Sequence, residues 1–578
     1  QSLNSSLSVG GNMIVASASA VTATGVHDIS GDLTISASHN DVIINNTQNL
    51  FSGLVSIDAQ NLNLVQTTGL VLGNVSVADD LTLTTGTGGV SGGISQSVGT
   101  IIEVLGHTYL IADSLLNQDA VLSAAGNQFV GSMTFDVANS GSWRDLTISN
   151  SSVQSQSVVI LPSTVRDVIV NADNSGLRFE TVDPTVVSGS LNATSLGDIE
   201  QNGALNVLGV VSLDSSSGDI ILGDSDNVFS NTLDLEGRDV TLALTGVLQL
   251  GTVTLSGDAA FTASDDITQS GPTVISGLAN FSSTNGSIAL NNAGNDFQGP
   301  VSLVATSPSE TISVTDAVGD MTLANVASGS TIDLITTDVG GALTLTGLVS
   351  ASDITLTSSG SIEQSSGQMS ITGTTTATAS DDIALDRAAN QLSGAVTASG
   401  DNVAVATAGE VTADITASGG AQLSGTGDVV VDLTVNGSVA VTSGNDATIR
   451  SAQALDLIAE VNGTADLTVA GDLSISASRD LDADISVTGG ATTLAVMGNT
   501  VLRSASDLQL GGSTTGDLTV TGSGGLSQSS ALSVGGDADL QITDDIVLNN
   551  ASNNFSGAVS GSATRIALTD SSGGLQLG

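Results

Sequence analysis

Pairs of adjacent aspartates are the residues of this chain whose type and spacing could do chemistry. Four pairs precede short apolar stretches: Asp79-Asp80, Asp265-Asp266, Asp381-Asp382 and Asp544-Asp545. Two carboxylates about 5–9 Å apart can share the acid and base roles in hydrolysis of a glycosidic bond. A catalytic centre is one special site, however, whereas these pairs recur at equivalent positions of a repeated sequence. We therefore interpret them as turn residues that precede strands, and we expect no catalytic residue and no enzyme activity.

A second acidic group alternates along the sequence at Asp480, Asp482 and Asp484. In a strand all three side chains would share one face, where their oxygen atoms could bind Ca²⁺. We favour a solvated acidic face, so no metal site is assigned and calcium stays open as the one candidate cofactor. The histidines are scattered without metal-ligand spacing: His27, His39 and His107. Glycine marks turns rather than a phosphate-binding loop, so no cofactor-binding residue is assigned either.

The charge balance excludes several classes of partner. The chain has 58 acidic and 9 basic residues, a formal net charge of −49, and its basic residues are all arginine. Binding to nucleic acid or docking on an anionic membrane would need a basic surface. No apolar run is long enough to span a bilayer. With no cysteine in the sequence, disulfides and thiolate metal sites are excluded, and the chain suits export in an unfolded state.

The composition predicts an all-β chain. Aromatic residues make up only 2% of the sequence, while 68 glycines accompany abundant Ser, Thr, Asn and Asp. Segments such as Gly31–Ile35 and Gly516–Val520 place Thr between two apolar residues after a Gly-Asp turn. In a strand both apolar side chains would point inward and the hydroxyl outward. Many short strands joined by tight turns are therefore expected.

Two short motifs recur in a fixed order. An apolar-x-Gln motif has its glutamine at five positions: Gln96, Gln201, Gln269, Gln364 and Gln528. An Asn-x-Phe motif, once with leucine in place of phenylalanine, ends at six positions: Phe51, Phe129, Phe229, Phe297, Leu392 and Phe555. The offsets from each glutamine to the Phe or Leu that follows are 33, 28, 28, 28 and 27 (129 − 96, 229 − 201, 297 − 269, 392 − 364, 555 − 528). This register identifies a true internal repeat whose units end near those six positions.

A finer period lies within each unit. The sequence numbers of Ile199 and Ile220 differ by 21 (220 − 199), and so do those of Ile267 and Ile288 (288 − 267). A period near 20 with about three short strands is typical of one coil of a parallel β-helix. We therefore predict an elongated parallel β-helix of roughly 28 coils, on the order of 130 Å long at ~4.8 Å per coil.

Two other β folds fit the sequence less well than a parallel β-helix. Tandem immunoglobulin-like domains carry a core aromatic residue in each domain and linkers between domains, and this chain shows no linker shift. Calcium-binding β-rolls need a Gly-Gly-x-Gly-x-Asp nonapeptide run that does not occur here. One continuous repetitive β-helix over residues 1–578 is the domain organisation we predict. Both ends resemble the interior of repeats, which indicates a piece of a longer chain.

The repeated units resemble a known family. The stretches ITQSGPTVISGLANFSSTNGSIALNNAGNDFQGPVSL and LSQSSALSVGG followed by DDIVLNNASNNFSGAV are similar to filamentous-haemagglutinin-like bacterial surface adhesins. The resemblance implies a right-handed parallel β-helix secreted across the outer membrane, often through a two-partner transporter. The secretion domain of that family, with its Asn-Pro-Asn-type motif, is not recognisable in this sequence. The segment would accordingly be shaft rather than secretion domain or tip.

These observations predict a structural role at the bacterial cell surface. We expect a structural and adhesive shaft of a secreted fibre, which presents an extended acidic surface for adhesion or for an extracellular matrix. Its expected partners are an outer-membrane transporter, copies of itself, and a ligand on a host cell, a neighbouring cell or the matrix. The alternatives are a glycan- or calcium-binding adhesion module and, less favoured, a polysaccharide-degrading β-helix enzyme.

Overall fold

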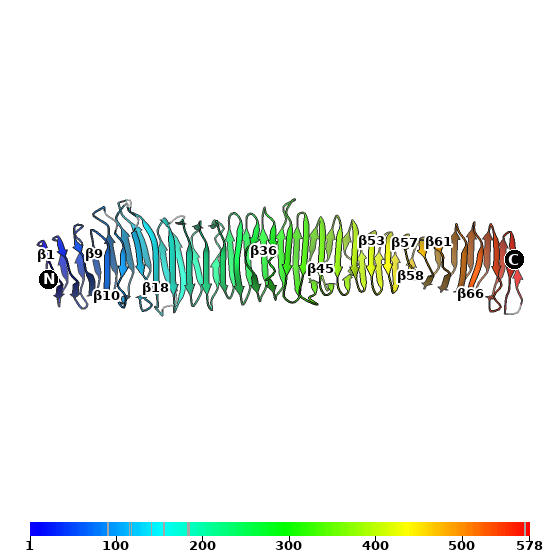
Figure 1. The fold of residues 1–578 in the computed structure, drawn as a ribbon, viewed down its shortest axis with the longest axis horizontal. Coiled ribbons are helices and arrows are strands. Elements are labelled where there is room, and N and C mark those ends of the chain that lie inside the picture. Colours follow the sequence, from blue (N-terminus) through cyan, green and yellow to red (C-terminus); the bar gives the residue numbers. More distant parts are fainter. Residues whose placement is uncertain are drawn as a thin grey trace. The chain divides into compact units, whose positions relative to one another are not determined.

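The computed structural model describes residues 1–89, 92–114, 116, 118–139, 141–153, 156–181, 185–571 and 574–578. The chain divides into two units, Gln1–Gly299 and Pro300–Gly578. In each unit short strands of successive coils lie side by side and pair in parallel (Figure 1). Each unit is thus a parallel β-solenoid with coils of roughly 20 residues, which confirms the predicted fold class. Within the described ranges no residue is helical, so none forms a helix that could span a membrane.

The first unit contains wide coils. Strand β34 (Ile267–Gln269) pairs with β37 (Ile288–Leu290), and Ile267 lies opposite Ile288, which is one coil later (288 − 267 = 21). The period found in the sequence is therefore the number of residues that separates two paired positions in successive coils. Parallel pairing places like residues directly above one another, which is why the apolar positions of one coil recur in the next.

The second unit contains narrower coils as well. Strand β53 (Val411–Ala417) pairs with β55 (Val429–Val435), and Val411 lies opposite Val429, a shorter period than in the wide coils (429 − 411 = 18). Burial alternates along β53, so that Val411, Ala413, Ile415 and Ala417 face the core. Small and β-branched side chains suffice to fill the interior of such a thin coil. This explains why the chain needs few aromatic residues.

Three phenylalanines of the first unit pack on one another between coils. Phe261 of β33 (Ala259–Ala263) lies opposite Phe281 of β36 (Ala279–Ser283), and the two rings stack with centroids 5.2 Å apart. Phe297 meets Phe281 edge to face at 6.2 Å. All three side chains are fully buried. The phenylalanine of the Asn-x-Phe motif therefore belongs to an internal aromatic stack in this repeat.

Each repeat adds a corner to the coil. The long strand β32 (Leu248–Leu255) pairs through its first half with β34 and through its second half with β35 (Thr273–Ile275). On the next coil β37 continues the first row, and β38 (Asp296–Phe297) continues the second. One straight strand is thereby replaced by two strands with a bend between them. The apolar-x-Gln motif lies at this bend in one coil, and the asparagine of Asn-x-Phe lies at the bend in the next.

The second row of strands stops at the Asn-x-Phe motif. Five further strands hold this motif: β7 (Leu50–Phe51), β16 (Gln128–Phe129), β29 (Val228–Phe229), β50 (Gln391–Leu392) and β69 (Asn554–Phe555). Within the described ranges, each of the five pairs with a strand of the preceding coil and with no strand of the following coil. These repeats thus end on a strand that has a free edge.

Candidate functional site

The two repeated motifs meet in space as a pair of side-chain amides. The Nε2 atom of Gln201 donates to Oδ1 of Asn227 at 2.8 Å, and Nδ2 of Asn227 donates to Oε1 of Gln201 at 2.8 Å. We call this reciprocal pair the amide clasp. It recurs in four other repeats: Gln96–Asn127, Gln269–Asn295, Gln364–Asn390 and Gln528–Asn553. The fixed offset in the sequence is therefore the spacing that lets one amide reach the other from coil to coil.

The asparagine of the clasp also takes the place of backbone hydrogen-bond partners at the bend. Its Oδ1 accepts the N–H of Leu205 at 2.9 Å, and its Nδ2 donates to the carbonyl of Leu222 at 3.2 Å. Asn227 is 0% exposed. An amide has two donors and two acceptor positions, and Asn227 uses all of them within the protein. The asparagine is shielded from solvent while Gln201 is half-buried, and the clasp holds two coils together at the point where the backbone ladder is interrupted.

The first repeat has the asparagine without the glutamine. Ala23 precedes Asn49 by the offset that separates Gln201 from Asn227 (49 − 23 = 227 − 201), so a side chain without an amide stands in the place of the glutamine. Asn49 still accepts the N–H of His27 at 2.9 Å and donates to the carbonyls of Ile44 and Val65 at 3.3 Å each. The asparagine is thus the constant member of the clasp.

The free edges of β7 and β16 are each capped by a side chain from the following coil. Oε1 of Gln66 accepts the N–H of Phe51 at 2.9 Å, and its Nε2 donates to the Phe51 carbonyl at 3.0 Å. Asn150 makes the same two bonds with Phe129, at 2.9 and 2.8 Å. A side-chain amide therefore stands in for the peptide group of the missing next strand. Caps of this kind remove the exposed edge that would otherwise attract another chain.

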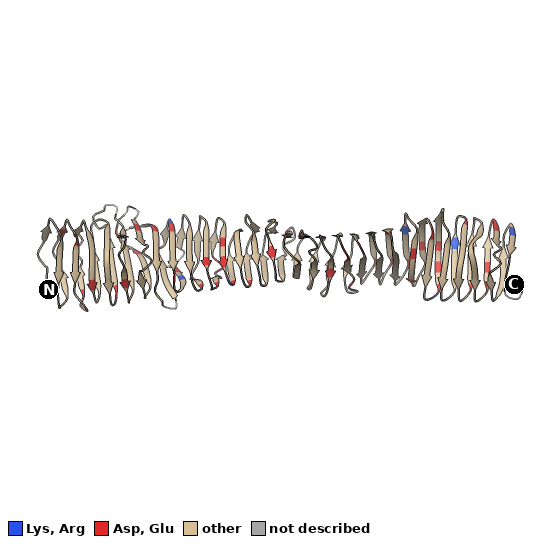
Figure 2. Ribbon diagram, turned by 60° about the horizontal axis from the view of Figure 1, so that its bottom comes forward, with Lys and Arg blue, Asp and Glu red and all other residues tan. Residues whose placement is uncertain are grey.

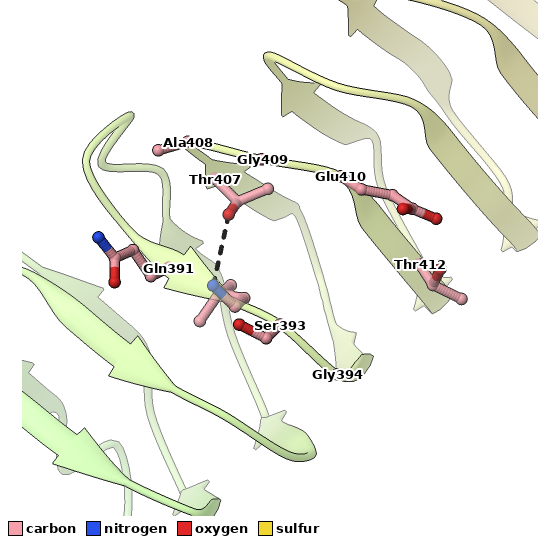
Figure 3. Close-up of a pocket in the computed structure, with 9 residues that line it drawn as sticks. Gln391, Ser393, Gly394, Thr407, Ala408, Gly409, Glu410 and Thr412 are labelled. Atoms are coloured by element: carbon pink, nitrogen blue, oxygen red, sulfur yellow. Dashed lines mark hydrogen bonds between the residues drawn. The ribbon is translucent and has the colours of Figure 1, made fainter.

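One repeat of the second unit has a weaker cap. Thr407 follows Asn390 at the same offset at which Gln66 follows Asn49 (407 − 390 = 66 − 49). The N–H of Leu392 donates to the Thr407 hydroxyl at 3.4 Å (Figure 3). That hydroxyl donates to the carbonyl of Asn390 at 3.0 Å. A hydroxyl has one proton, so Thr407 cannot also donate to the Leu392 carbonyl.

A cavity of about 520 Å³ lies beside this weaker cap. We call it the Thr407 hollow. Its polar side chains come from both coils: Gln391 and Ser393 from the edge strand and its continuation, and Thr407, Glu410 and Thr412 from the following coil (Figure 3). Among the described residues that line it, Glu410 is the only charged one. Sequence reasoning missed the hollow, because a threonine at this position looks like any other strand residue.

Three of the aspartate pairs lie at turns and bind the backbone of the following coil, whereas Asp545 of the fourth pair lies in strand β68 (Asp545–Leu548). Three of them accept an N–H through Oδ1: Asp80 from His107 at 2.8 Å, Asp266 from Ser287 at 2.8 Å and Asp382 from Asn402 at 3.0 Å. The fourth pair contributes Asp545, whose carboxylate pairs with Arg565. Asp and Glu are spread along the strands and turns of both units rather than gathered in one place (Figure 2). The turn interpretation of these pairs therefore has a concrete hydrogen-bonding role.

Some turn aspartates form columns that run from coil to coil. The N–H of Asp258 donates to Oδ1 of Asp239 at 2.7 Å, and the N–H of Leu278 donates to Oδ1 of Asp258 at 2.7 Å. The same Asp239 donates its own N–H to Asp219 at 3.3 Å. Each carboxylate thus accepts from the turn above it, and the acidity of the chain is partly a consequence of how its turns are stacked.

Low pH is expected to weaken the contact between Asp353 and Thr374 of the following coil. Asp353 accepts both the hydroxyl and the N–H of Thr374 at 2.7 Å, and these bonds lower the pKa of its carboxyl below the usual value. Because the folded pKa is depressed, the stabilisation is present above the unfolded pKa of about 3.9 and is lost as pH falls through the folded value. We expect exchange protection of the Thr374 amide to decline below about pH 4. The variant Asp353→Asn keeps an acceptor that does not titrate, so its Thr374 protection should not follow that decline; equal declines would contradict the assignment.

The three alternating aspartates do not all share one strand face. Asp482 and Asp484 lie on the outer face of β61 (Leu481–Thr488), and Arg503 of the following coil pairs with Asp482 and reaches Asp484 at 3.6 Å. Asp480 precedes the strand and accepts the N–H of Asn499 at 2.7 Å. The prediction of a shared strand face was wrong for Asp480, because β61 begins at Leu481 and Asp480 still belongs to the preceding turn.

The histidines are separate features. His27 is buried in β4 (His27–Ile29), with its Nδ1 atom 2.7 Å from the Gly25 carbonyl. His39 has a positive φ of 65° in a turn, and His107 contacts the Ser132 hydroxyl at 2.8 Å. In the part of the chain that the structure describes, no three His, Asp or Glu side chains form a group that could hold a metal ion.

Comparison with known proteins identifies the repeats. A family described as "Repeats of unknown function (DUF5649)" matches residues 2–58, 59–136, 165–236, 237–304, 331–399 and 497–562. These six segments make up more than half of the sequence. The chain belongs to this repeat family. Comparisons with curated proteins and with solved structures gave no match.

The DUF5649 segments end in register with the last strand of each repeat. Every match stops at the same offset of seven after the Phe or Leu of Asn-x-Phe: 58 − 51, 136 − 129, 236 − 229, 304 − 297, 399 − 392 and 562 − 555. The long stretch from 400 to 496 has no match. It contains the narrow coils of β53 and β55, and the Thr407 hollow lies where the fifth DUF5649 segment meets it.

Proposed function

We propose that this chain is the structural shaft of a secreted bacterial surface fibre. The observation that carries the proposal is the burial of the repeated asparagines. The asparagine of every clasp is 0% exposed, and its hydrogen-bonding capacity is directed to coils of the same chain. A group that recurs in each repeat and is closed to solvent serves the stacking of coils, not a ligand.

The exterior supports the same role. With a formal net charge of −49, the surface repels copies of itself and keeps a long solenoid soluble. Turn carboxylates and capped edges leave little backbone open to unwanted pairing. Secretion through an outer-membrane transporter and attachment to a cell or matrix ligand are parts of this proposal that rest on the likeness to filamentous-haemagglutinin-like adhesins. In this proposal the chain lies outside the cell, between an anchor and a contact surface.

Changing the number of repeats tests the shaft function. Residues 237–304 begin and end at equivalent points, since each cut lies at the same offset past Phe229 or Phe297. We expect three added copies in the parent organism to lengthen the surface fibre by about 45 Å, since each copy adds roughly three coils at ~4.8 Å. Cryo-electron tomography of the cell surface measures that length.

A matched control distinguishes the effect of folded coils from the effect of added residues. Three inserted copies in which the clasp residue Asn295 is replaced with leucine contain the same number of residues but lack the buried amide. They are expected to give shorter or irregular extensions. Fibres of unchanged length with the intact copies, or chain retained inside the cell, would contradict the shaft function.

A further inference from the structure

The caps of the repeats are not equivalent, and one of the differences lies at the Thr407 hollow. In the first unit the carboxamide of Gln66 bonds both the N–H and the carbonyl of Phe51. It also donates to the carbonyl of Gly69 at 2.8 Å, so the side chain fills the space beside the edge strand. In the second unit the residue at the same offset is Thr407. Its side chain is too short to bond both backbone groups of the edge strand or to fill the space beside that strand. Thr407 therefore leaves free, beside β50, the position that the Gln66 carboxamide takes beside β7.

The edge strand β50 therefore presents an incomplete pair of backbone groups. The Leu392 N–H has only a long bond of 3.4 Å to Thr407. The Leu392 carbonyl receives nothing from the threonine, whose proton goes to Asn390. Backbone polar groups away from bulk water are normally paired. A ligand that offers one acceptor and one donor with the spacing of an amide would complete both bonds.

We propose that the Thr407 hollow binds an extended peptide segment of a partner protein, with one peptide group of the partner taking the place of the Gln66 carboxamide. The chain itself shows that an amide satisfies this edge, and strand addition to a free edge is a common mode of peptide recognition. The site goes beyond the shaft function, because it would fasten a second protein at the edge of β50.

The charge and size of the Thr407 hollow restrict which peptides could bind there. Glu410 supplies one carboxylate, with Ser393 and Thr412 as neutral neighbours, so a basic residue beside the bound peptide group is favoured. None of the nine lining residues is aromatic, which leaves no stacking surface for a sugar ring. At about 520 Å³ the hollow has room for a few residues of an extended chain.

Binding can be followed at the Leu392 amide itself. The full chain, labelled with ¹⁵N-leucine, is titrated with the blocked tripeptide acetyl-Val-Arg-Val-amide to about 10 mM, a range suited to millimolar affinity. We expect a saturable shift of the Leu392 resonance, and binding about fivefold weaker for acetyl-Val-Glu-Val-amide. No shift with the arginine peptide would overturn the proposal. A shift produced by N,N′-diacetylchitobiose and not by the peptide would overturn it in favour of a glycan.

Two substitutions form a loss-and-gain pair. Thr407→Gln installs the residue found at the equivalent position of the first repeat and should abolish the peptide-induced shift. Gln66→Thr should open a second hollow, seen as a new shift of the Phe51 amide in ¹⁵N-phenylalanine-labelled chain. If Thr407→Gln prevents folding, Glu410→Gln replaces it and should remove the preference for arginine over glutamate. Equal binding by Thr407→Gln and the unaltered chain, or no loss of preference in Glu410→Gln, would overturn the proposal.

Discussion

Replacing Asn227 with leucine is expected to lower the local free energy of unfolding of its repeat by about 4 kcal/mol. Leucine has a similar volume but no polar atom. The substitution would leave the Leu205 N–H, the Leu222 carbonyl and the Gln201 amide without the partners they now have. Each buried polar group left unsatisfied costs about 1–3 kcal/mol, and their sum exceeds the gain from a more apolar side chain.

Hydrogen exchange at the Leu205 amide reports this change directly. A loss of about 4 kcal/mol corresponds to exchange roughly a thousandfold faster. Local exchange is the right measure because a long solenoid does not unfold in one step. The control is Asn192→Leu, on the partly exposed outer face of β24 (Leu191–Ser195), which should leave Leu205 exchange nearly unchanged. Equal effects of both substitutions would show that the clasp is not what stabilises the bend.

Gly347→Ala is expected to destabilise the second unit by about 3 kcal/mol through steric overlap. Gly347 lies at the bend between β43 (Leu343–Leu345) and β44 (Val349–Ala351). A Cβ atom there would stand 1.2 Å from the carbonyl oxygen of Ala324 in the preceding coil. Because that atom belongs to the backbone, relief requires the two coils to separate. The N–H of Val326 now donates to the Leu348 carbonyl at 2.9 Å, so exchange at Val326 should rise first.

The matched control for this prediction is Gly409→Ala. A Cβ atom at Gly409 would meet no atom within 4 Å, and its backbone φ is not in the left-handed region. We expect Val326 exchange in that variant to equal that of the unaltered chain. Unchanged Val326 protection in Gly347→Ala would show that the corner tolerates a side chain and that the close approach of the coils is not essential.

The solenoid could be predicted from the sequence because its periodicity is local and repeated. The spacing of Ile267 and Ile288 in the sequence is also their register in the structure. Inward alternation of small apolar residues then follows from strand geometry. The clasp was harder to foresee. The offset between Gln201 and Asn227 was visible, but the pairing of their amides depends on two coils bending at the same place, which no single strand reveals.

The caps lay beyond what the sequence alone could predict. In the last repeat Asp570 serves as the cap, since its Oδ1 accepts the N–H of Phe555 at 3.2 Å. Gln66, Thr407 and Asp570 follow the asparagines of their repeats at one common offset (66 − 49 = 407 − 390 = 570 − 553), yet their side chains have no common type. What they share is a position beside a strand that has no partner in the following coil, which is a property of the fold and not of the local sequence. The continuous organisation of residues 1–578 stays a prediction, since the two units are described separately.

The short row of strands that begins at the bend and ends at Asn-x-Phe has a consequence for how the gene can change. In the third repeat the row runs from β20 (Thr164–Val165) through β23 (Thr185–Val187) and β26 (Leu205–Val207) to β29. It opens and closes without needing a continuation. Unequal recombination between repeats would therefore add or delete whole modules without leaving an orphaned strand. Lineages could vary the number of repeats while the fold of each one stays the same.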